Sequence, residues 1–82
     1  MRSYDKYRKL EKIVCNKCGR SLKIDNGIPK EGVFQVVKAW EYFSEKDGQI
    51  DLFDLCEPCY DAWTAGFCVP PEVKENTELL GN

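Results

Sequence analysis

The sequence predicts a small α+β domain that is stabilised by a bound metal ion. Three observations lead to this fold class. Two cysteine pairs with C-x2-C spacing, Cys15/Cys18 and Cys56/Cys59, are separated by a long stretch without cysteine. That stretch contains a segment with strong strand character, and a helical pattern follows the second pair. Two such pairs in a small protein indicate one four-thiolate site, for which zinc is the usual metal.

The chain of 82 residues has room for one domain with one core. A domain of this size buries only about 60% of the surface that its unfolded chain exposes, so a metal ion often supplements a thin core. We divide the chain into an N-terminal segment (1–12), a zinc-binding domain (13–68) and a C-terminal arm (69–82).

The sequence gives no sign of a secretory signal or of a membrane span. Residues 1–14 are charged throughout, and no later segment approaches the ~20 apolar residues that a spanning helix needs. We therefore expect a cytoplasmic protein without membrane contacts. Paired cysteines in a reducing cytosol are more often bound to metal than linked as disulfides.

The net charge of −2 conceals an asymmetry between the two parts of the chain. Residues 2–30 contain nine Lys or Arg and three acidic residues, whereas the chain from Glu31 onward contains three Lys and eleven acidic residues. We interpret this distribution first as a solvated surface of mixed charge. The basic first part is also compatible with binding to phosphates of a nucleic acid.

Residues 1–10 are expected to form a short helix, because Tyr4, Tyr7 and Leu10 recur at a spacing of three. Residues 12–14 then look like an extended lead-in to the first cysteine pair. The expected helix is short and carries many long charged side chains.

Residues 15–19, with the sequence CNKCG, have the form of a zinc knuckle, a tight turn in which two thiolates converge on one ion. Gly19 suits the positive φ angle that such a turn requires after its second ligand. Four thiolates and one Zn²⁺ sum to a formal charge of −4 + 2 = −2. We expect Lys17 and Arg20 to offset this charge.

The middle of the chain predicts strands. Residues 21–24 alternate polar and apolar side chains, and residues 25–27 indicate a turn. Residues 33–43 are the strongest strand candidate, with apolar side chains on both faces, so we expect both faces to be packed. One face carries Phe34, Val36, Trp40 and Tyr42, and the other carries Val33, Val37, Ala39 and Phe43.

A hairpin and a helix are predicted next. Residues 44–49 form a polar connection with an Asp-Gly turn signal, and residues 50–55 form the return strand that ends at Cys56. Residues 57–66 predict a short helix, with Pro58 in its first turn and Gly66 at its C-terminal cap.

The C-terminal arm begins where Val69-Pro70-Pro71 excludes a helix. Residues 72–80 are compatible with another short helix or with an extended arm. In either form, we expect Val73, Leu79 and Leu80 to dock on apolar surface.

The order of knuckle, hairpin and helix over residues 13–66 resembles the treble-clef class within the treble-clef and zinc-ribbon superfamily of four-cysteine zinc-binding domains. A helix N-terminus favours anions, so cysteines at that position bind metal well. A rubredoxin-like iron site also uses two C-x2-C turns, but Tyr60 rather than glycine follows the second pair. Iron and redox-active or disulfide-linked cysteines therefore remain as less favoured alternatives to one structural zinc ion bound by Cys15, Cys18, Cys56 and Cys59.

The sequence contains no convincing catalytic group. It has no histidine, which removes the commonest general base, and four cysteine ligands leave no open position on a metal. Asp51 and Asp54 are three residues apart on an expected strand and so face opposite sides. Cys68 lies among apolar neighbours and is expected to be a buried, inert thiol. We therefore expect a protein that is not an enzyme.

The favoured function is a non-catalytic zinc module that binds a protein partner or a second copy of itself. The chain contains many aromatic side chains for one small core, and aromatic residues are frequent interface anchors. The alternative is a nucleic-acid-binding zinc domain that uses the basic N-terminal segment. Glu57 and Asp61 argue against the alternative, because the helix that carries them has no Lys or Arg.

Overall fold

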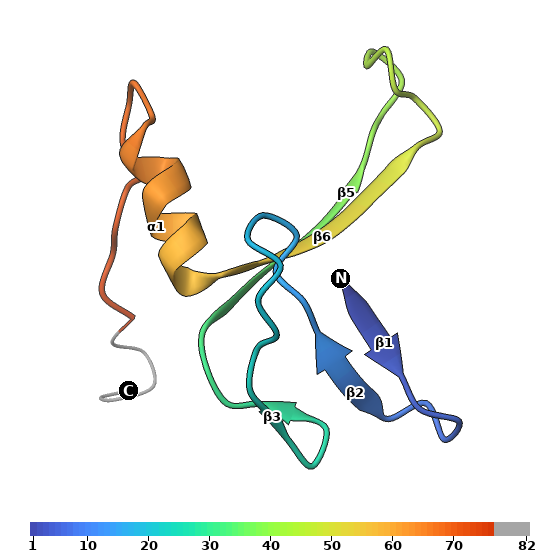
Figure 1. Cartoon of the computed structure of the whole chain (residues 1–82). Helices are drawn as coiled ribbons and strands as arrows, with labels where there is room; N and C mark the ends of the chain where they lie inside the picture. Colours follow the sequence, from blue (N-terminus) through green and yellow to red (C-terminus); the bar gives the residue numbers. More distant parts are fainter. Residues whose placement is uncertain (77–82) are drawn as a thin grey trace.

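The computed structural model describes residues 1–76, which form three small antiparallel hairpins and one short helix (Figure 1). The helix follows the last strand without a linker. The predicted α+β class is confirmed for this part of the chain. In order, the elements are β1 (Arg2–Tyr4), β2 (Leu10–Ile13), β3 (Ile24–Asp25), β4 (Ile28–Pro29), β5 (Val33–Ala39), β6 (Ile50–Cys56) and α1 (Glu57–Ala65).

The N-terminal residues form the hairpin β1–β2, and the predicted helix over residues 1–10 is wrong. The side chain of Asp5 accepts hydrogen bonds from the backbone N–H groups of Tyr7 and Lys9, and Arg8 adopts a φ of 64°. An aspartate that binds the backbone in this way favours a turn over a helix. The extended lead-in to the first cysteine pair is confirmed, because β2 ends at Ile13.

The second hairpin is shorter than the sequence indicates. Asn26 and Gly27 have φ angles of 55° and 77°, as in the tight turn that joins two antiparallel strands. The predicted turn is therefore confirmed, but the strand begins at Ile24 rather than at Ser21. Ser21 instead forms an isolated antiparallel bridge with Val14, on either side of the knuckle.

The hairpin β5–β6 is the longest sheet and has the predicted return strand. Its register runs from Val33 opposite Cys56 to Ala39 opposite Ile50. Strand β5 ends at Ala39 rather than at Phe43. After the hydrogen bond from Trp40 N to Gln49 O, the chain turns through a loop that contains Gly48 at a φ of 89°.

The prediction that both faces of this strand are packed is wrong for its outer half. Val37 on β5 and Leu52 and Ile50 on β6 are 61%, 59% and 58% exposed, and the register places all three on one face. Tyr42 and Phe43 in the loop are also exposed. The outer half of the hairpin projects away from the other elements (Figure 1).

Helix α1 is confirmed where the sequence predicts it, with Pro58 in its first turn. None of its residues is fully buried. It packs on the start of β5 through Phe34, whose ring centroid lies 4.8 Å from that of Tyr60 and 5.9 Å from that of Trp63. Gly66 caps the helix at a φ of −88°, so this cap does not use the left-handed conformation.

Among residues 1–76, the core contains five buried apolar residues, and two of them are Cys15 and Cys56. The other three are Ile13, Leu22 and Leu55. Burial of one such aliphatic side chain contributes about 1.5–3 kcal/mol, so three of them give limited stability. Cys15 and Cys56 therefore make up a large part of this small core.

The arm after α1 has no helix or strand over residues 67–76. Val73 is 86% exposed, so its expected docking on apolar surface is wrong. Leu79 and Leu80 lie outside the described residues. None of the helical structure in residues 1–76 has the length and apolar character that a bilayer crossing requires.

Candidate metal centre

The structure brings together the four cysteines of the two C-x2-C pairs. Their Sγ atoms all lie within 4.8 Å of one another, and the Sγ atoms of Cys18 and Cys56 are 3.8 Å apart. A tetrahedral site with metal–sulfur bonds of about 2.3 Å separates its sulfurs by roughly 3.8 Å. The cluster therefore has the size and the donor atoms to bind one metal ion.

The first pair lies in a turn that closes a narrow antiparallel ladder. Hydrogen bonds from Cys15 N to Arg20 O and from Leu22 N to Ile13 O hold the two sides of this ladder together. Within the turn, the backbone N–H of Cys18 points at Cys15 Sγ over 3.5 Å. This is the arrangement expected of a knuckle, in which N–H groups stabilise a thiolate.

Gly19 makes the knuckle turn possible. Its N–H donates to the carbonyl of Cys15 over 2.9 Å, and its φ angle is 79°. A residue with a side chain adopts this left-handed conformation only at a cost. The glycine therefore serves the backbone geometry, as the sequence predicts.

The second pair lies where β6 becomes α1. Cys56 is the last residue of β6 and the N-cap of the helix, and its side chain makes no capping hydrogen bond. Its sulfur is therefore available to a metal. Cys59 follows in the first turn of the helix, where the free N–H groups favour negative charge.

The two halves of the cluster are joined by Asn16 and Asp54. Asn16 N donates to Asp54 O over 2.8 Å, and Asp54 N donates to Asn16 Oδ1 over 3.0 Å. The knuckle thus binds the outer edge of β6 two residues before Cys56. This pairing fixes the distance between the two C-x2-C turns.

The carboxylate of Asp54 is buried and binds the N-terminal hairpin. It accepts a hydrogen bond from Arg2 Nε at 3.1 Å, and its other oxygen lies 3.2 Å from the amino group of Met1. Only 3% of Asp54 is exposed. A buried carboxylate needs such partners, and here they hold β1 against the sheet.

The pKa values of the cysteines show that the cluster favours a cation. Burial opposes ionisation of Cys15, but hydrogen bonds from the backbone at Cys18, Cys56 and Lys17 outweigh it and lower its pKa to about 6. The backbone of Cys59 lowers the pKa of Cys56. The side chain of Cys56 and burial raise the pKa of Cys59 to about 12. The pKa values of Cys15 and Cys56 are thus lowered and that of Cys59 is raised, and a cation between the sulfurs would favour the thiolate form.

Arg20 lies beside the cluster, as expected. Its guanidinium forms two hydrogen bonds with the Glu31 carboxylate, at 2.8 and 3.2 Å. The bond to Glu31 and the proximity of the Cys56 sulfur raise the pKa of Arg20, and Arg20 lowers the pKa of Glu31. The backbone of Lys17, and not its ammonium group, is among the groups that lower the pKa of Cys15.

The sequence reasoning missed three residues that shape the centre, namely Asn16, Glu31 and Asp54. Each acts on a residue that is distant in the sequence, by 38 positions for Asn16 and Asp54. No local pattern indicates such a pairing. The position of Asn16 inside the first C-x2-C turn is the one available signal, because short polar side chains often bind nearby backbone.

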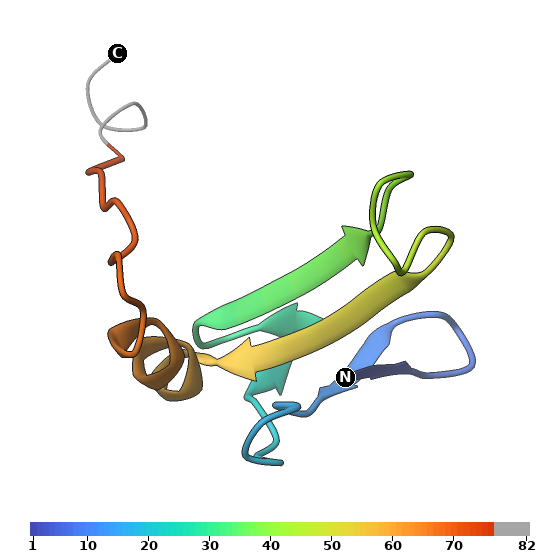
Figure 2. The same cartoon turned by 90° about the horizontal axis from the view of Figure 1, so that it is seen from above.

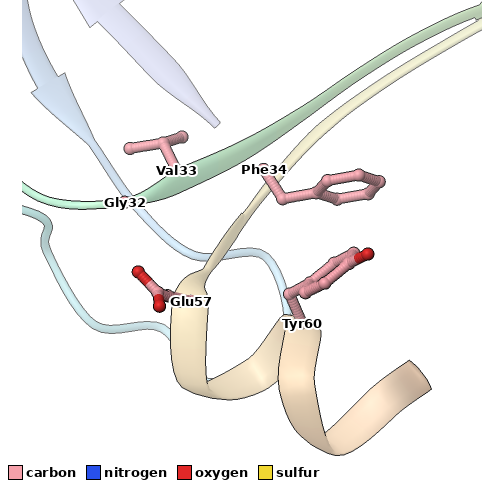
Figure 3. Close-up of a pocket in the computed structure, with 5 residues that line it drawn as sticks. All are labelled: Gly32, Val33, Phe34, Glu57 and Tyr60. Atoms are coloured by element: carbon pink, nitrogen blue, oxygen red, sulfur yellow. The ribbon is translucent and has the colours of Figure 1, made fainter. Parts of the chain in front are cut away.

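A shallow pocket of about 220 Å³ lies between the starts of β5 and α1 (Figure 3). Val33, Phe34 and Tyr60 give it an apolar wall, and Glu57 supplies a carboxylate at one side. A side chain at Gly32 would clash with the Glu57 carboxylate. Glycine at this position therefore leaves room for Glu57.

The remaining candidate residues lie outside the cluster. Asp51 and Asp54 lie on opposite faces of β6, as predicted, because Asp51 pairs with Lys38 and Asp54 with Gln35. Hydrogen bonds from Gln49 and from the indole of Trp40 lower the pKa of Asp51. Cys68 is exposed, so the prediction of a buried thiol is wrong, and its place after the end of α1 explains this.

Comparison with models of protein families, with curated proteins and with solved structures finds no match for this chain.

Proposed function

We propose that this chain is a non-catalytic protein-interaction module whose fold depends on one structural zinc ion. The observation that carries the proposal is the convergence of Cys15, Cys18, Cys56 and Cys59, of which Cys15 and Cys56 are part of the small core. Four thiolates complete a tetrahedral zinc shell and leave no position for a substrate. The metal would thus stabilise the fold and not take part in a reaction.

Zinc fits the donor set better than iron. The two turns differ, because Gly19 completes the first and a helix begins at the second. This asymmetry, with a knuckle, a hairpin and a helix in that order, supports a treble-clef interpretation. A rubredoxin-like iron site would use two equivalent turns, each followed by glycine.

The surface that we propose for a protein partner is the loop between β5 and β6. Tyr42 and Phe43 are 80% and 95% exposed, and their rings contact each other at a centroid distance of 5.1 Å. Exposed aromatic side chains of this kind act as anchors in protein interfaces.

The base of this loop is held in place by Trp40. Its indole donates to Asp51 over 3.0 Å, and the ammonium groups of Lys38 and Lys46 lie 5.3 and 4.9 Å from its ring. Such contacts restrain the loop, so that Tyr42 and Phe43 project from a fixed support.

The metal part of the proposal is tested by elemental analysis of the purified chain. We expect one zinc ion per chain and loss of the near-UV circular dichroism signal after treatment with a strong chelator. A chain that contains no metal, or that keeps its signal and melting temperature without metal, would overturn the zinc assignment.

The partner is tested by capture from a lysate with the zinc-loaded chain. We expect the double variant Tyr42→Ser, Phe43→Ser to lose captured proteins that the unmodified chain retains. Tyr7→Ser is the matched control, because Tyr7 is 77% exposed in a different loop. Equal capture by all three forms contradicts the loop surface. Salt-sensitive binding to DNA or RNA instead of protein supports the nucleic-acid alternative.

A further inference from the structure

Among residues 1–76, no strand covers the outer edge of β5, whereas the outer edge of β6 is partly occupied by Asn16 of the knuckle. Strand β5 pairs with β6 on one side, and among residues 1–76 no strand pairs with its other side. Figure 2 shows this edge lying open along the length of β5. A two-stranded sheet alone is marginally stable in water, and an open edge is a template for another strand.

The unpaired backbone groups of β5 can be identified from the register. Trp40 N donates to Gln49 O, and these two residues continue the register that pairs Ala39 with Ile50. Hydrogen-bonded pairs alternate along an antiparallel ladder. The N–H and C=O groups of Val33, Gln35, Val37 and Ala39 therefore point away from β6.

This edge lacks the features that normally block strand pairing. Between Val33 and Ala39 there is no proline, and the register to β6 shows no bulge. Lys38 is the one charged residue of β5. Its ammonium lies 3.1 Å from Glu41 and 5.3 Å from the Trp40 ring, so Lys38 is held on the face opposite to Val37.

We propose that β5 pairs with β5 of a second copy of this chain, which joins the two hairpins into one four-stranded antiparallel sheet. This inference rests on the proposed function, and it adds to the loop a second interaction surface, the edge of β5, whose partner is another copy of the chain. The antiparallel register that uses the whole strand places Val33 opposite Ala39 of the other copy and Val36 on the two-fold axis. Gln35 then lies opposite Val37 of the other copy.

A second copy suits this edge better than an unrelated strand, because the pairing is self-complementary. In this register Lys38 faces Phe34 of the other copy and not another lysine, so no like charges lie directly opposite each other. The same patch serves both copies, as two-fold symmetry requires. Val37, which is 61% exposed, gains a neighbour across the new strand pair.

The first experiment measures the mass of the full zinc-loaded chain in solution by light scattering at several concentrations. We expect a mass twice the 9.5 kDa of the single chain at high concentration and dissociation on dilution. A chain that binds zinc and stays monomeric throughout would overturn the paired edge and leave the zinc module intact. A chain without zinc would instead contradict the proposed function.

Two double variants test the register. In the variant Gln35→Lys with Val37→Lys, the lysine at 35 of each copy lies opposite the lysine at 37 of the other copy. We expect a monomer, because like charges directly opposite each other repel. Gln35→Lys with Val37→Glu places opposite charges there, and we expect a dimer that weakens as salt is added.

Both variants remove Val37 and add two charges. They differ at residue 37, where the added charge is positive in one variant and negative in the other. Zinc content and circular dichroism must match those of the unmodified chain. A dimer in both variants, or a monomer in both, overturns the proposed pairing. Val73→Lys is the control for a charge at an exposed valine elsewhere, because Val73 is 86% exposed in the arm. Loss of the dimer in this control would also overturn the proposed pairing of β5 with β5.

Discussion

The four cluster cysteines differ in their surroundings although their spacing is the same. Cys15 and Cys56 are buried, Cys59 is half-buried and Cys18 is exposed. In a tetrahedral site each ligand supplies one quarter of the shell, whatever its exposure. The exposed Cys18 therefore belongs to the candidate donor set together with the buried cysteines, whereas the exposed Cys68 lies outside this cluster.

Cys18→Ser is expected to remove zinc and cooperative folding, while Cys68→Ser leaves both unchanged. Structural zinc contributes on the order of 10–16 kcal/mol, which exceeds the net stability of many small domains. The zinc content of each variant and its thermal melting curve test these two expectations. Equal melting of the two variants would contradict a metal ligand role for Cys18.

Gly19→Ala is expected to destabilise the domain by about 1–2 kcal/mol, because its φ of 79° is the left-handed conformation. Nothing lies within 4 Å of an added Cβ, so the cost comes from the backbone alone. Gly66→Ala is the control, since a φ of −88° suits alanine. Urea unfolding of the zinc-loaded proteins measures the free energy of unfolding of both variants. A neutral Gly19→Ala would contradict the backbone argument.

At the scale of elements, the hairpins are joined by few polar contacts. The β1–β2 hairpin meets β6 at the buried carboxylate of Asp54, and the knuckle meets it through Asn16. These contacts cross from one hairpin to another, so they decide how the elements assemble. The hairpins themselves form from local turn signals.

Asp54→Asn is expected to cost about 1–3 kcal/mol, because it leaves Arg2 without its charged partner. Asp61→Asn is the control, since Asp61 is exposed on α1 and should change stability by less than ~0.5 kcal/mol. Denaturant unfolding of the zinc-loaded chains gives both values. If the two variants unfold alike, Asp54 does not hold the N-terminal hairpin.

For the molecule as a whole, stability is expected to fall as the solution becomes acidic. The pKa of Cys15 is about 6 in the fold, below the value of about 8.5 for an unfolded thiol. A depressed pKa stabilises the fold fully above the unfolded value, and this contribution is lost as the pH falls through 6. Bound metal requires thiolates as well, so both effects have the same sign.

We therefore expect zinc to be retained at pH 8 and released progressively as the solution is acidified, together with loss of circular dichroism. A zinc-sensitive dye follows the release, and a return to pH 8 with added zinc should restore the signal. Retention of zinc at pH 3 would contradict thiolate ligands.

Local patterns predicted much of this structure. The helix after Cys56, the β5–β6 hairpin and the knuckle turn follow from proline, glycine and alternating apolar residues at short range. The predicted N-terminal helix failed because a spacing of three among three residues is weaker than one aspartate that binds the turn backbone. The burial of Cys68 and of the outer strand face failed because burial depends on what packs there.

The four candidate ligands follow from the sequence alone, because the C-x2-C spacing predicts which thiols can share an ion. The sequence also determined the local elements that carry them. The pairing of Asp54 with Asn16, and the absence of a strand on the outer edge of β5 within residues 1–76, are visible only in the folded structure. The difference arises from the sequence separation of the residues that interact. Turns and helix starts depend on neighbouring residues, whereas edge exposure and buried ion pairs depend on contacts between distant parts of the chain.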